Sequence, residues 1–375
     1  MIPLNQNLNA LKRSQIRVFA NLAKETPGCA SLTIGEPDLD TPEAIKLAAM
    51  DALRDNRTHY APNQGTPALR EAIAEFETRR GNPTEPENVL VTVGACQALF
   101  TALLGILNPG EEIVVPTPGF GLYETVATIA GAKTVPLDVT QTGFQITRES
   151  LEAVITEKTK AVILNSPCNP TGTVFNRESL QAVKEAVLGK PIFVICDNVY
   201  HDLSYTDCPD ISCDGDLREQ MVLCQSFSKP WAMTGWRIGY LVCPEYVMDR
   251  LLLLSAATIT AVPTFLQEAA ITALQTDVTP MREIYRKRRD YVCDRLRQMG
   301  LSFPEPEGAF YVFVNIAKFG LNSGDFCTRM IREGKLAAVP GACFGTEGYI
   351  RLSYCYSDAE LKTGLDRLEA FIATL

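Results

Sequence analysis

The sequence predicts an α/β fold with a mostly parallel, seven-stranded sheet in a large domain and a smaller α+β domain. Three observations lead to this prediction. Seven short, apolar runs alternate with helix-length segments through the middle of the chain, and this pattern changes after Thr279. The length of 375 residues also suits two domains, because one domain usually has about 100–200 residues.

The N-terminal part is expected to contribute an arm, a turn and two helices. Residues 1–30 are polar and weakly patterned, so we expect an arm that lies on another domain or subunit. Residues 34–38 predict a turn, since glycine and proline stand close together there. Residues 41–43 (Thr-Pro-Glu) predict a capped helix start with proline at the first position, and Thr66-Pro67 predicts another.

Seven runs in the middle of the chain are expected to form the strands of the sheet. They are residues 89–93, 113–115, 134–137, 161–164, 192–196, 221–224 and 238–242. A parallel sheet has helices on both faces, so its strands should be apolar throughout, as these runs are.

The C-terminal part predicts the smaller α+β unit. A long charged helix is expected from Thr279, and we interpret its basic run, residues 286–289, as a solvated face. The strands expected in this unit are residues 310–314, 337–339 and 349–353. We therefore predict a large domain over 46–280 and a discontinuous small domain formed by 1–45 and 281–375.

Composition argues against several kinds of partner. The chain has 35 basic and 44 acidic side chains, a net charge of −9, which disfavours general binding to nucleic acid or to an anionic membrane. With only two histidines, we expect no metal site. The most apolar stretch, residues 251–266, is interrupted by polar residues and shorter than the roughly 20 residues of a spanning helix.

The twelve cysteines are expected to be reduced thiols, most of them buried. Many lie in apolar runs, none forms a C-x-x-C pair, and no signal-peptide pattern is present. These features favour a cytoplasmic protein.

Four of the expected strands end in residues that are more polar or smaller than packing alone requires. These endings are residues 94–96 (Gly-Ala-Cys), 165–172, 197–200 and 226–229. Ligands of open α/β sheets bind beyond the carboxyl ends of the strands, so we expect the four endings to meet at one crevice.

Part of this crevice favours an anion. Residues 94–96 lie between an expected strand and an expected helix, so the amides of Ala95 and Cys96 would face a ligand at the helix N-terminus. Three side chains could bind the same anion: the hydroxyls of Ser226 and Ser228 and the guanidinium of Arg237, which is suited to phosphate.

Lys229 is the candidate nucleophile of the crevice. If it formed an imine with an aldehyde cofactor, its amine would have to lose a proton, which burial and the nearby charge of Arg237 would favour. Pro230 keeps Lys229 out of the helical region and therefore in a turn. The alternative is an ordinary surface lysine, which the flanking S-x-S-K and T-G-W-R motifs make less attractive.

Several motifs together resemble the class I/II aminotransferases, which are fold-type I enzymes of pyridoxal 5′-phosphate. They are S-x-S-K at 226–229, T-G-W-R at 234–237, N-P-T-G at 169–172, D-x-x-Y at 197–200, and Arg351. The resemblance extends from about residue 35 to residue 351. It implies a ping-pong reaction that moves an amino group from an L-amino acid to a 2-oxo acid.

The resemblance also implies roles around the cofactor ring. Lys229 would hold the aldehyde and later move the substrate proton, and Asp197 would pair with the pyridine nitrogen. Asn169 and Tyr200 would bind the phenolic oxygen, although Asn169-Pro170 could also be a plain turn. Phe120 matches the aromatic that stacks on the ring, and the alternative is an ordinary core residue.

Three further residues are expected around the phosphate and the substrate. Tyr60 resembles the tyrosine that reaches the phosphate from the neighbouring subunit, so a homodimer with shared sites is implied. Arg351 matches the arginine that binds the α-carboxylate, the alternative being an edge-strand charge. Gly35 matches the residue whose backbone lies against the substrate where the small domain closes, and Asn169 is also expected to contact the substrate.

Departures from the family pattern leave the substrate open. Ala95 and Cys96 stand where serine, glycine, threonine or lysine is frequent, and Phe120 replaces a commoner tryptophan or tyrosine. No residue is marked as the ligand of a distal acidic group.

Two alternative functions follow from the same motifs. One is a pyridoxal-phosphate-dependent C–S β-lyase, and the other is a non-catalytic cofactor-binding regulator. Too few residues precede Gly35 for an appended DNA-binding domain, and all catalytic positions are filled, which disfavours the regulator. No G-x-x-x-x-G-K-[ST] motif is present for a nucleotide.

Overall fold

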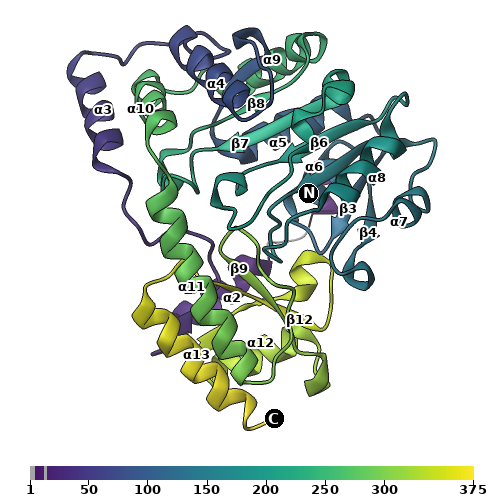
Figure 1. The fold of residues 1–375 in the computed structure, drawn as a ribbon, viewed down its shortest axis with the longest axis vertical. Coiled ribbons are helices and arrows are strands. Elements are labelled where there is room, and N and C mark those ends of the chain that lie inside the picture. The colour runs from purple at the N-terminus through teal and green to yellow at the C-terminus, as the bar shows by residue number, and fades with distance from the viewer. Residues whose placement is uncertain (1–4, 12–14) are drawn as a thin grey trace.

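The computed structural model describes residues 5–11 and 15–375 and is built around one seven-stranded sheet (Figure 1). The strand order is β2-β8-β7-β6-β5-β3-β4. The strands are β2 (Val89–Thr92), β3 (Glu112–Thr117), β4 (Lys133–Asp138), β5 (Thr159–Asn165), β6 (Phe193–Asp197), β7 (Met221–Ser226) and β8 (Gly239–Val242). Only β8 runs antiparallel to its neighbours, β2 and β7. The predicted mostly parallel sheet of seven strands is confirmed.

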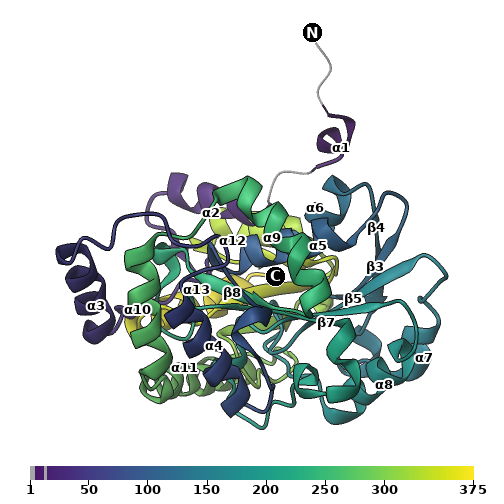
Figure 2. The ribbon, with the colours of Figure 1, turned by 90° about the horizontal axis from the view of Figure 1, so that it is seen from above.

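Helices cover both faces of this sheet. On one face lie α5 (Gly94–Ile106), α6 (Leu122–Ile129) and α9 (Glu245–Ile259), and on the other lie α7 (Arg148–Glu152) and α8 (Arg177–Val187), as Figure 2 shows. Alternate residues of one strand reach opposite faces: Ile195 packs with the first group, Val194 and Cys196 with the second. This double burial explains why the inner strands are largely apolar, whereas the edge strand β4, with exposed Lys133 and Asp138, is not apolar throughout.

Three helices pack together beside β2 and β8. They are α3 (Glu43–Arg54), α4 (Pro67–Arg79) and α10 (Thr264–Gln275). Thr66 caps α4 by accepting from the Leu69 amide, as predicted. The predicted cap of α3 is wrong, because Pro42 takes the N-cap position and the Thr41 hydroxyl donates instead to the Ala232 carbonyl at 2.7 Å.

A second, smaller group of elements contains residues from both ends of the chain. Its antiparallel sheet has the order β11 (Val339–Pro340), β12 (Tyr349–Ser353), β9 (Tyr311–Asn315), and β1 (Ala30–Ser31) pairs in parallel with β10 (Leu336–Ala337). The single strand predicted at 337–339 is therefore two strands in two sheets. The helices of this group are α2 (Gln15–Glu25), α11 (Thr279–Gln298), α12 (Ser323–Arg332) and α13 (Asp358–Ile372).

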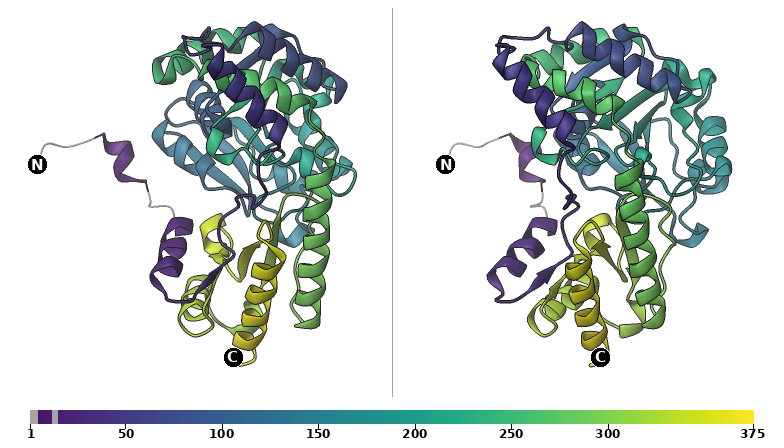
Figure 3. Two further views of the ribbon diagram at one scale, coloured as in Figure 1. Left: turned by 90° about the vertical axis from the view of Figure 1, so that its left-hand side faces the viewer. Right: turned by 60° about the vertical axis from the view of Figure 1, so that its left-hand side comes forward.

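The two groups of elements lie one below the other in Figure 1, and α11 and α13 lie side by side in Figure 3. The short helix α1 (Gln6–Asn9) contacts α6, with the Asn7 amide donating to the Ile129 carbonyl at 3.2 Å. The domain boundaries at residues 46 and 280 stay a prediction.

All twelve cysteines are free thiols, and most are buried. None of the helices in the described part of the chain is both long and apolar enough to cross a membrane. Residues 5–11 and 15–375 contain no group of three or more histidine, cysteine or acidic side chains that could hold a metal ion.

Candidate active site

The loops that follow β5 and β6 are joined by side chains at the carboxyl edge of the sheet. Asn165 ends β5, and its amide nitrogen donates to the Asp197 carbonyl at the end of β6 at 2.8 Å. The Asn165 amide oxygen accepts from the Asn169 backbone nitrogen at 2.8 Å. The two predicted strand endings therefore meet, as expected for the ligand edge of an open α/β sheet.

Asp197 is a buried carboxylate with a neutral partner. Its side chain accepts from the Tyr123 hydroxyl at 2.6 Å and from the Val199 amide at 3.4 Å. No ion pair involves Asp197 within the described residues. Burial raises the pKa of Asp197 to about 6, although the bond from Tyr123 acts in the opposite direction. A buried carboxylate of this kind is suited to a cationic N–H ligand.

Lys229 lies in the turn after β7, and Pro230 follows it. Its Nζ donates to the Gly35 carbonyl at 2.6 Å. Burial lowers the pKa of Lys229, and the positive charge of Arg237 lowers it further, while nearby thiols and an acid oppose the change. The amine is therefore easier to deprotonate than that of a solvated lysine.

Hydroxyls and a guanidinium gather beside this lysine. The Ser226 hydroxyl donates to the Ser228 hydroxyl at 2.9 Å, and Arg237 Nη1 contacts Ser228 Oγ at 3.5 Å and the Thr234 carbonyl at 2.7 Å. No ion pair involves Arg237 in residues 5–11 and 15–375. This group, Ser226, Ser228 and Arg237, is called the anion cradle below.

The first turn of α5 lies next to the anion cradle. No side chain caps this turn, so its backbone amides are available to a ligand. Gly94 has a φ of +70°, and a β-carbon at this position would lie 2.7 Å from Arg237 Nη2. The next two residues, Ala95 and Cys96, give their amides to this turn, and only glycine at position 94 lets Arg237 approach so closely.

Arg351 is a buried guanidinium whose partners are neutral. Nη1 donates to the Asn169 amide oxygen at 2.7 Å and Nη2 to the Thr33 carbonyl at 2.6 Å. Nε has no hydrogen-bond partner in the described structure. The guanidinium lies 4.4 Å from the Tyr311 ring centre and 4.9 Å from that of Phe344. Its charge is therefore available to an anionic ligand group.

Tyr200 and Gly35 both lie next to the hydroxyl of Tyr311. The hydroxyls of Tyr200 and Tyr311 are 2.7 Å apart. A β-carbon at Gly35 would come within 1.8 Å of the Tyr311 hydroxyl, so this position requires glycine. Gly35 thus brings its carbonyl to Lys229 while its α-carbon faces Tyr311.

Two predicted residues stand at the margin of this arrangement. Phe120 packs edge-on against Tyr123, with ring centres 5.9 Å apart, and so lies next to the tyrosine that binds Asp197. The side chain of Tyr60 is 91% exposed and is not joined to the other candidates by any hydrogen bond within the described chain.

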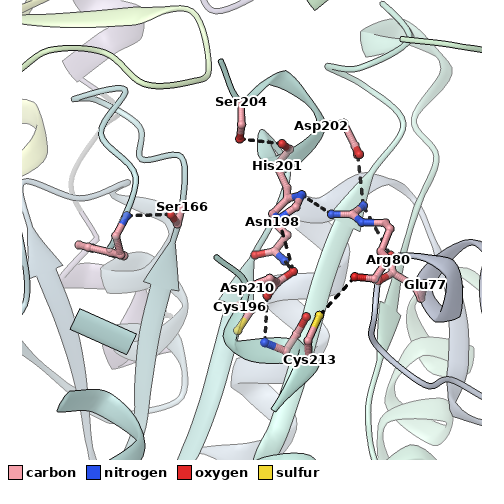
Figure 4. Close-up of polar contacts among 12 residues, drawn as sticks. Glu77, Arg80, Ser166, Cys196, Asn198, His201, Asp202, Ser204, Asp210 and Cys213 are labelled. Carbon is pink, nitrogen blue, oxygen red and sulfur yellow. Dashed lines mark hydrogen bonds and ion pairs between the residues drawn. The ribbon is translucent and has the colours of Figure 1, made fainter. Parts of the chain in front are cut away.

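A second polar group surrounds residues of the loop that follows β6 (Figure 4). Its main members are Glu77, Arg80, Asn198, His201, Asp202 and Asp210. Arg80 donates to Asp202 at 3.3 Å and to Nδ1 of His201. Because a guanidinium only donates, Nδ1 accepts and the ring proton lies on Nε2. Burial and the charge of Arg80 lower the pKa of His201, so the ring is neutral near pH 7.

The sequence reasoning missed two tyrosines that bind the candidate residues, Tyr123 and Tyr311. Tyr123 stands three residues after Phe120, the spacing of one helix face, and this signal could have linked it to the site. Tyr311 lies inside an apolar strand, and nothing in its sequence setting distinguishes it from a core residue.

Comparisons with known proteins identify the family of this chain. The family model for aminotransferase class I and II matches residues 27–368. The chain is 39% identical to a probable N-acetyl-LL-diaminopimelate aminotransferase of Bacillus subtilis, over 98% of this chain and 95% of the relative. It is also 39% identical to an aspartate aminotransferase of Pyrococcus abyssi, over 98% and 97%.

The solved structures include an aspartate aminotransferase from Thermotoga maritima. Its TM-score to this chain is 0.95 at 34% identity, with 99% of this chain and 100% of that chain covered. The resemblance read from the motifs is confirmed, and so is the predicted fold. The chain belongs to the class I and II aminotransferase family.

Proposed function

We propose that this aminotransferase moves the amino group of an L-amino acid to a 2-oxo acid with pyridoxal 5′-phosphate held at Lys229. One observation carries the proposal. A partly buried lysine with a lowered pKa lies beside an anion cradle, at the same edge of the sheet as a buried carboxylate without a cationic partner.

These three features fit the three polar parts of the cofactor. The anion cradle and the first turn of α5, including the amides of Ala95 and Cys96, would bind the phosphate. Asp197 would accept from the pyridine N–H, which relieves the cost of its burial. When bound, the cofactor supplies an aldehyde for the amine and a ring that accepts electrons from the substrate α-carbon.

Lys229 would bind the aldehyde and later act as the acid and base of the reaction. Once an amino donor takes its place on the aldehyde, the freed Nζ can remove the proton from the substrate α-carbon. The Gly35 carbonyl, 2.6 Å from Nζ, would hold the amine in position. Burial lowers the pKa of Lys229, so this amine gives up its proton more readily than a solvated lysine does.

Arg351 would bind the substrate α-carboxylate. Its acceptors, the Asn169 amide and the Thr33 carbonyl, are neutral, so a carboxylate can take their place without breaking an ion pair. The amide nitrogen of Asn169 and the hydroxyl of Tyr200 would donate to the phenolic oxygen of the cofactor.

Tyr60 would complete the site of a second copy in a homodimer. Its ring is 91% exposed, and three apolar side chains of α3 are also about half exposed: Leu47, Met50 and Leu53. Apolar exposure of this extent favours a subunit contact.

The smaller unit would close over the substrate, as the proposed division of the chain at residues 46 and 280 allows. The twelve free cysteines favour a protein of the reducing cytoplasm.

Single half-reactions test the proposed function. The purified protein, loaded with pyridoxal phosphate, is mixed with one amino acid at a time and without any oxo acid. The panel covers two of the donor classes in the names of the relatives, aspartate and aromatic amino acids, together with alanine. We expect the absorbance of the aldehyde form to give way to that of pyridoxamine phosphate, with one equivalent of oxo acid.

Other outcomes of this experiment would contradict the proposal. Cystathionine is added to the panel for this purpose, and repeated release of pyruvate, ammonia and a thiol from it, without any added acceptor oxo acid, would indicate a C–S lyase. Stable cofactor absorbance with no conversion by any donor would indicate a protein that binds the cofactor without catalysis.

A further inference from the structure

Tyr311 lies where four parts of the candidate active site meet. It is 2% exposed and belongs to β9 of the smaller sheet. Its ring faces Arg351, its hydroxyl lies 2.7 Å from that of Tyr200, and the α-carbon of Gly35 rests on the same hydroxyl. Through Gly35 it also adjoins the carbonyl that binds Lys229.

Strand register explains why Tyr311 meets Arg351. In the antiparallel pair β9–β12, Tyr311 stands opposite Ser353, and Arg351 stands opposite Phe313. Tyr311 and Arg351 are therefore diagonal neighbours on one face of the sheet, within reach of long side chains. The 4.4 Å distance between guanidinium and ring centre is that of a cation–π contact.

The hydroxyl of Tyr311 makes the contact with the larger sheet. The rings of Tyr200 and Tyr311 meet edge to face, with centres 5.5 Å apart. Tyr200 follows β6, whereas Tyr311 belongs to the smaller sheet, so this bond spans both groups of elements. A hydroxyl that receives a hydrogen bond becomes a better donor, so Tyr311 can strengthen the bond that Tyr200 makes to a ligand.

We propose that Tyr311 is a positioning residue with two separable tasks in this aminotransferase. Its ring fixes the Arg351 guanidinium for the substrate α-carboxylate. Its hydroxyl donates to Tyr200 and so strengthens the donation of Tyr200 to the phenolic oxygen of the cofactor. This inference rests on the proposed function, and it adds a residue of the smaller sheet to the control of the cofactor.

The variant Tyr311→Phe tests the hydroxyl. It keeps the ring over Arg351 and removes the donor to Tyr200. The absorbance of the bound cofactor is titrated with pH, without substrate. We expect the midpoint of this pH titration to rise by about 0.5–1 pH unit, the equivalent of one hydrogen bond. The reason is that a phenolic oxygen with a weaker hydrogen bond from Tyr200 holds the proton that it shares with the neighbouring nitrogen more tightly.

A double-variant cycle with Tyr200→Phe assigns this shift to the pair of hydroxyls. If Tyr311 acts through Tyr200, then Tyr311→Phe adds no further shift in the Tyr200→Phe background. An unchanged midpoint in Tyr311→Phe, or an equal shift in both backgrounds, would overturn this part of the inference.

The variant Tyr311→Met tests the ring. Methionine fills much of the volume but has no π face for Arg351. With an amino donor that the half-reactions have identified, we expect KM to rise about 3- to 30-fold in Tyr311→Met and to change little in Tyr311→Phe. The corresponding amine without the α-carboxylate should show no such difference between the variants.

Equal KM values for the amino donor in Tyr311→Met and Tyr311→Phe would overturn the role of the ring. If Tyr311→Met proves too unstable to purify, Tyr311→Leu replaces it with the same expectation. Failure of the proposed function would be recognised separately, since the unaltered protein would then show no half-reaction at all.

Discussion

Replacing Asp197 with asparagine should stabilise the cofactor-free protein at neutral pH. Burial raises the pKa of this carboxyl from 3.8 to about 6. The folded protein therefore binds the proton more tightly than the unfolded chain does. The contribution of Asp197 to the free energy of unfolding is greatest below pH 4 and falls as the pH rises from about 4 to 6. Above pH 6 the folded protein carries the full cost of the buried charge.

The magnitude follows from that rise in pKa. At 1.36 kcal/mol per pKa unit, a rise from 3.8 to about 6 corresponds to roughly 3 kcal/mol of unfolding free energy lost above pH 6. The Tyr123 hydroxyl can still donate to an asparagine oxygen, although the bond to a neutral acceptor is weaker. We therefore expect Asp197→Asn to gain about 1–3 kcal/mol at pH 7.5.

Urea unfolding of the cofactor-free proteins measures this effect at pH 7.5 and at pH 4. The gain should be present at pH 7.5 and small at pH 4, where the carboxyl is protonated in the folded protein and close to its titration midpoint in the unfolded chain. Asp138→Asn, at the exposed end of β4, is the matched control and should gain nothing at either pH. An Asp197→Asn variant that is no more stable at pH 7.5, or equally stabilised at both pH values, would refute this reasoning.

Three further substitutions test separate parts of the site. Gly94→Ala should weaken cofactor binding at least tenfold in a fluorescence titration, because the added carbon would lie 2.7 Å from a guanidinium nitrogen of the anion cradle. Gly235→Ala, with open space around it, is its control and should bind normally. Arg351→Lys should raise KM for amino donors by about 10- to 100-fold with a smaller change in kcat, since lysine cannot make the planar paired contact. His201→Asn keeps an acceptor for Arg80, whereas His201→Leu leaves a donor unpaired, so the leucine variant should lose about 1–3 kcal/mol more in urea unfolding. An equal loss of unfolding free energy in the two His201 variants would exclude the His201 ring as an acceptor that stabilises Arg80.

The strands and most candidate residues could be predicted because their signals are local. Burial on both faces makes the inner strands of the main sheet largely apolar, and a polar residue at the end of such a strand, such as Asp197, then stands out. The turn that carries Lys229 is signalled by the residues around it, above all Pro230. The sheet topology then brings these strand ends to one edge without further information.

The contacts that could not be predicted depend on the register between distant segments. Tyr311 reaches Arg351 through the pairing of β9 with β12, and it reaches Tyr200 through the packing of one sheet against the other. The break within 337–339 arises because β10 pairs with β1, a partner from the other end of the chain. The Thr41 hydroxyl does not form the predicted cap of α3 but donates to the Ala232 carbonyl, 191 residues away in the chain.

The claim that Lys229 holds the cofactor can be tested by reductive trapping. The protein loaded with pyridoxal phosphate is reduced with borohydride, digested, and analysed by peptide mass spectrometry. We predict one pyridoxyl group per chain on the peptide that contains Lys229, and none in Lys229→Ala. A label on another lysine, or a Lys229→Ala variant that keeps its amino-transfer activity, would contradict the account.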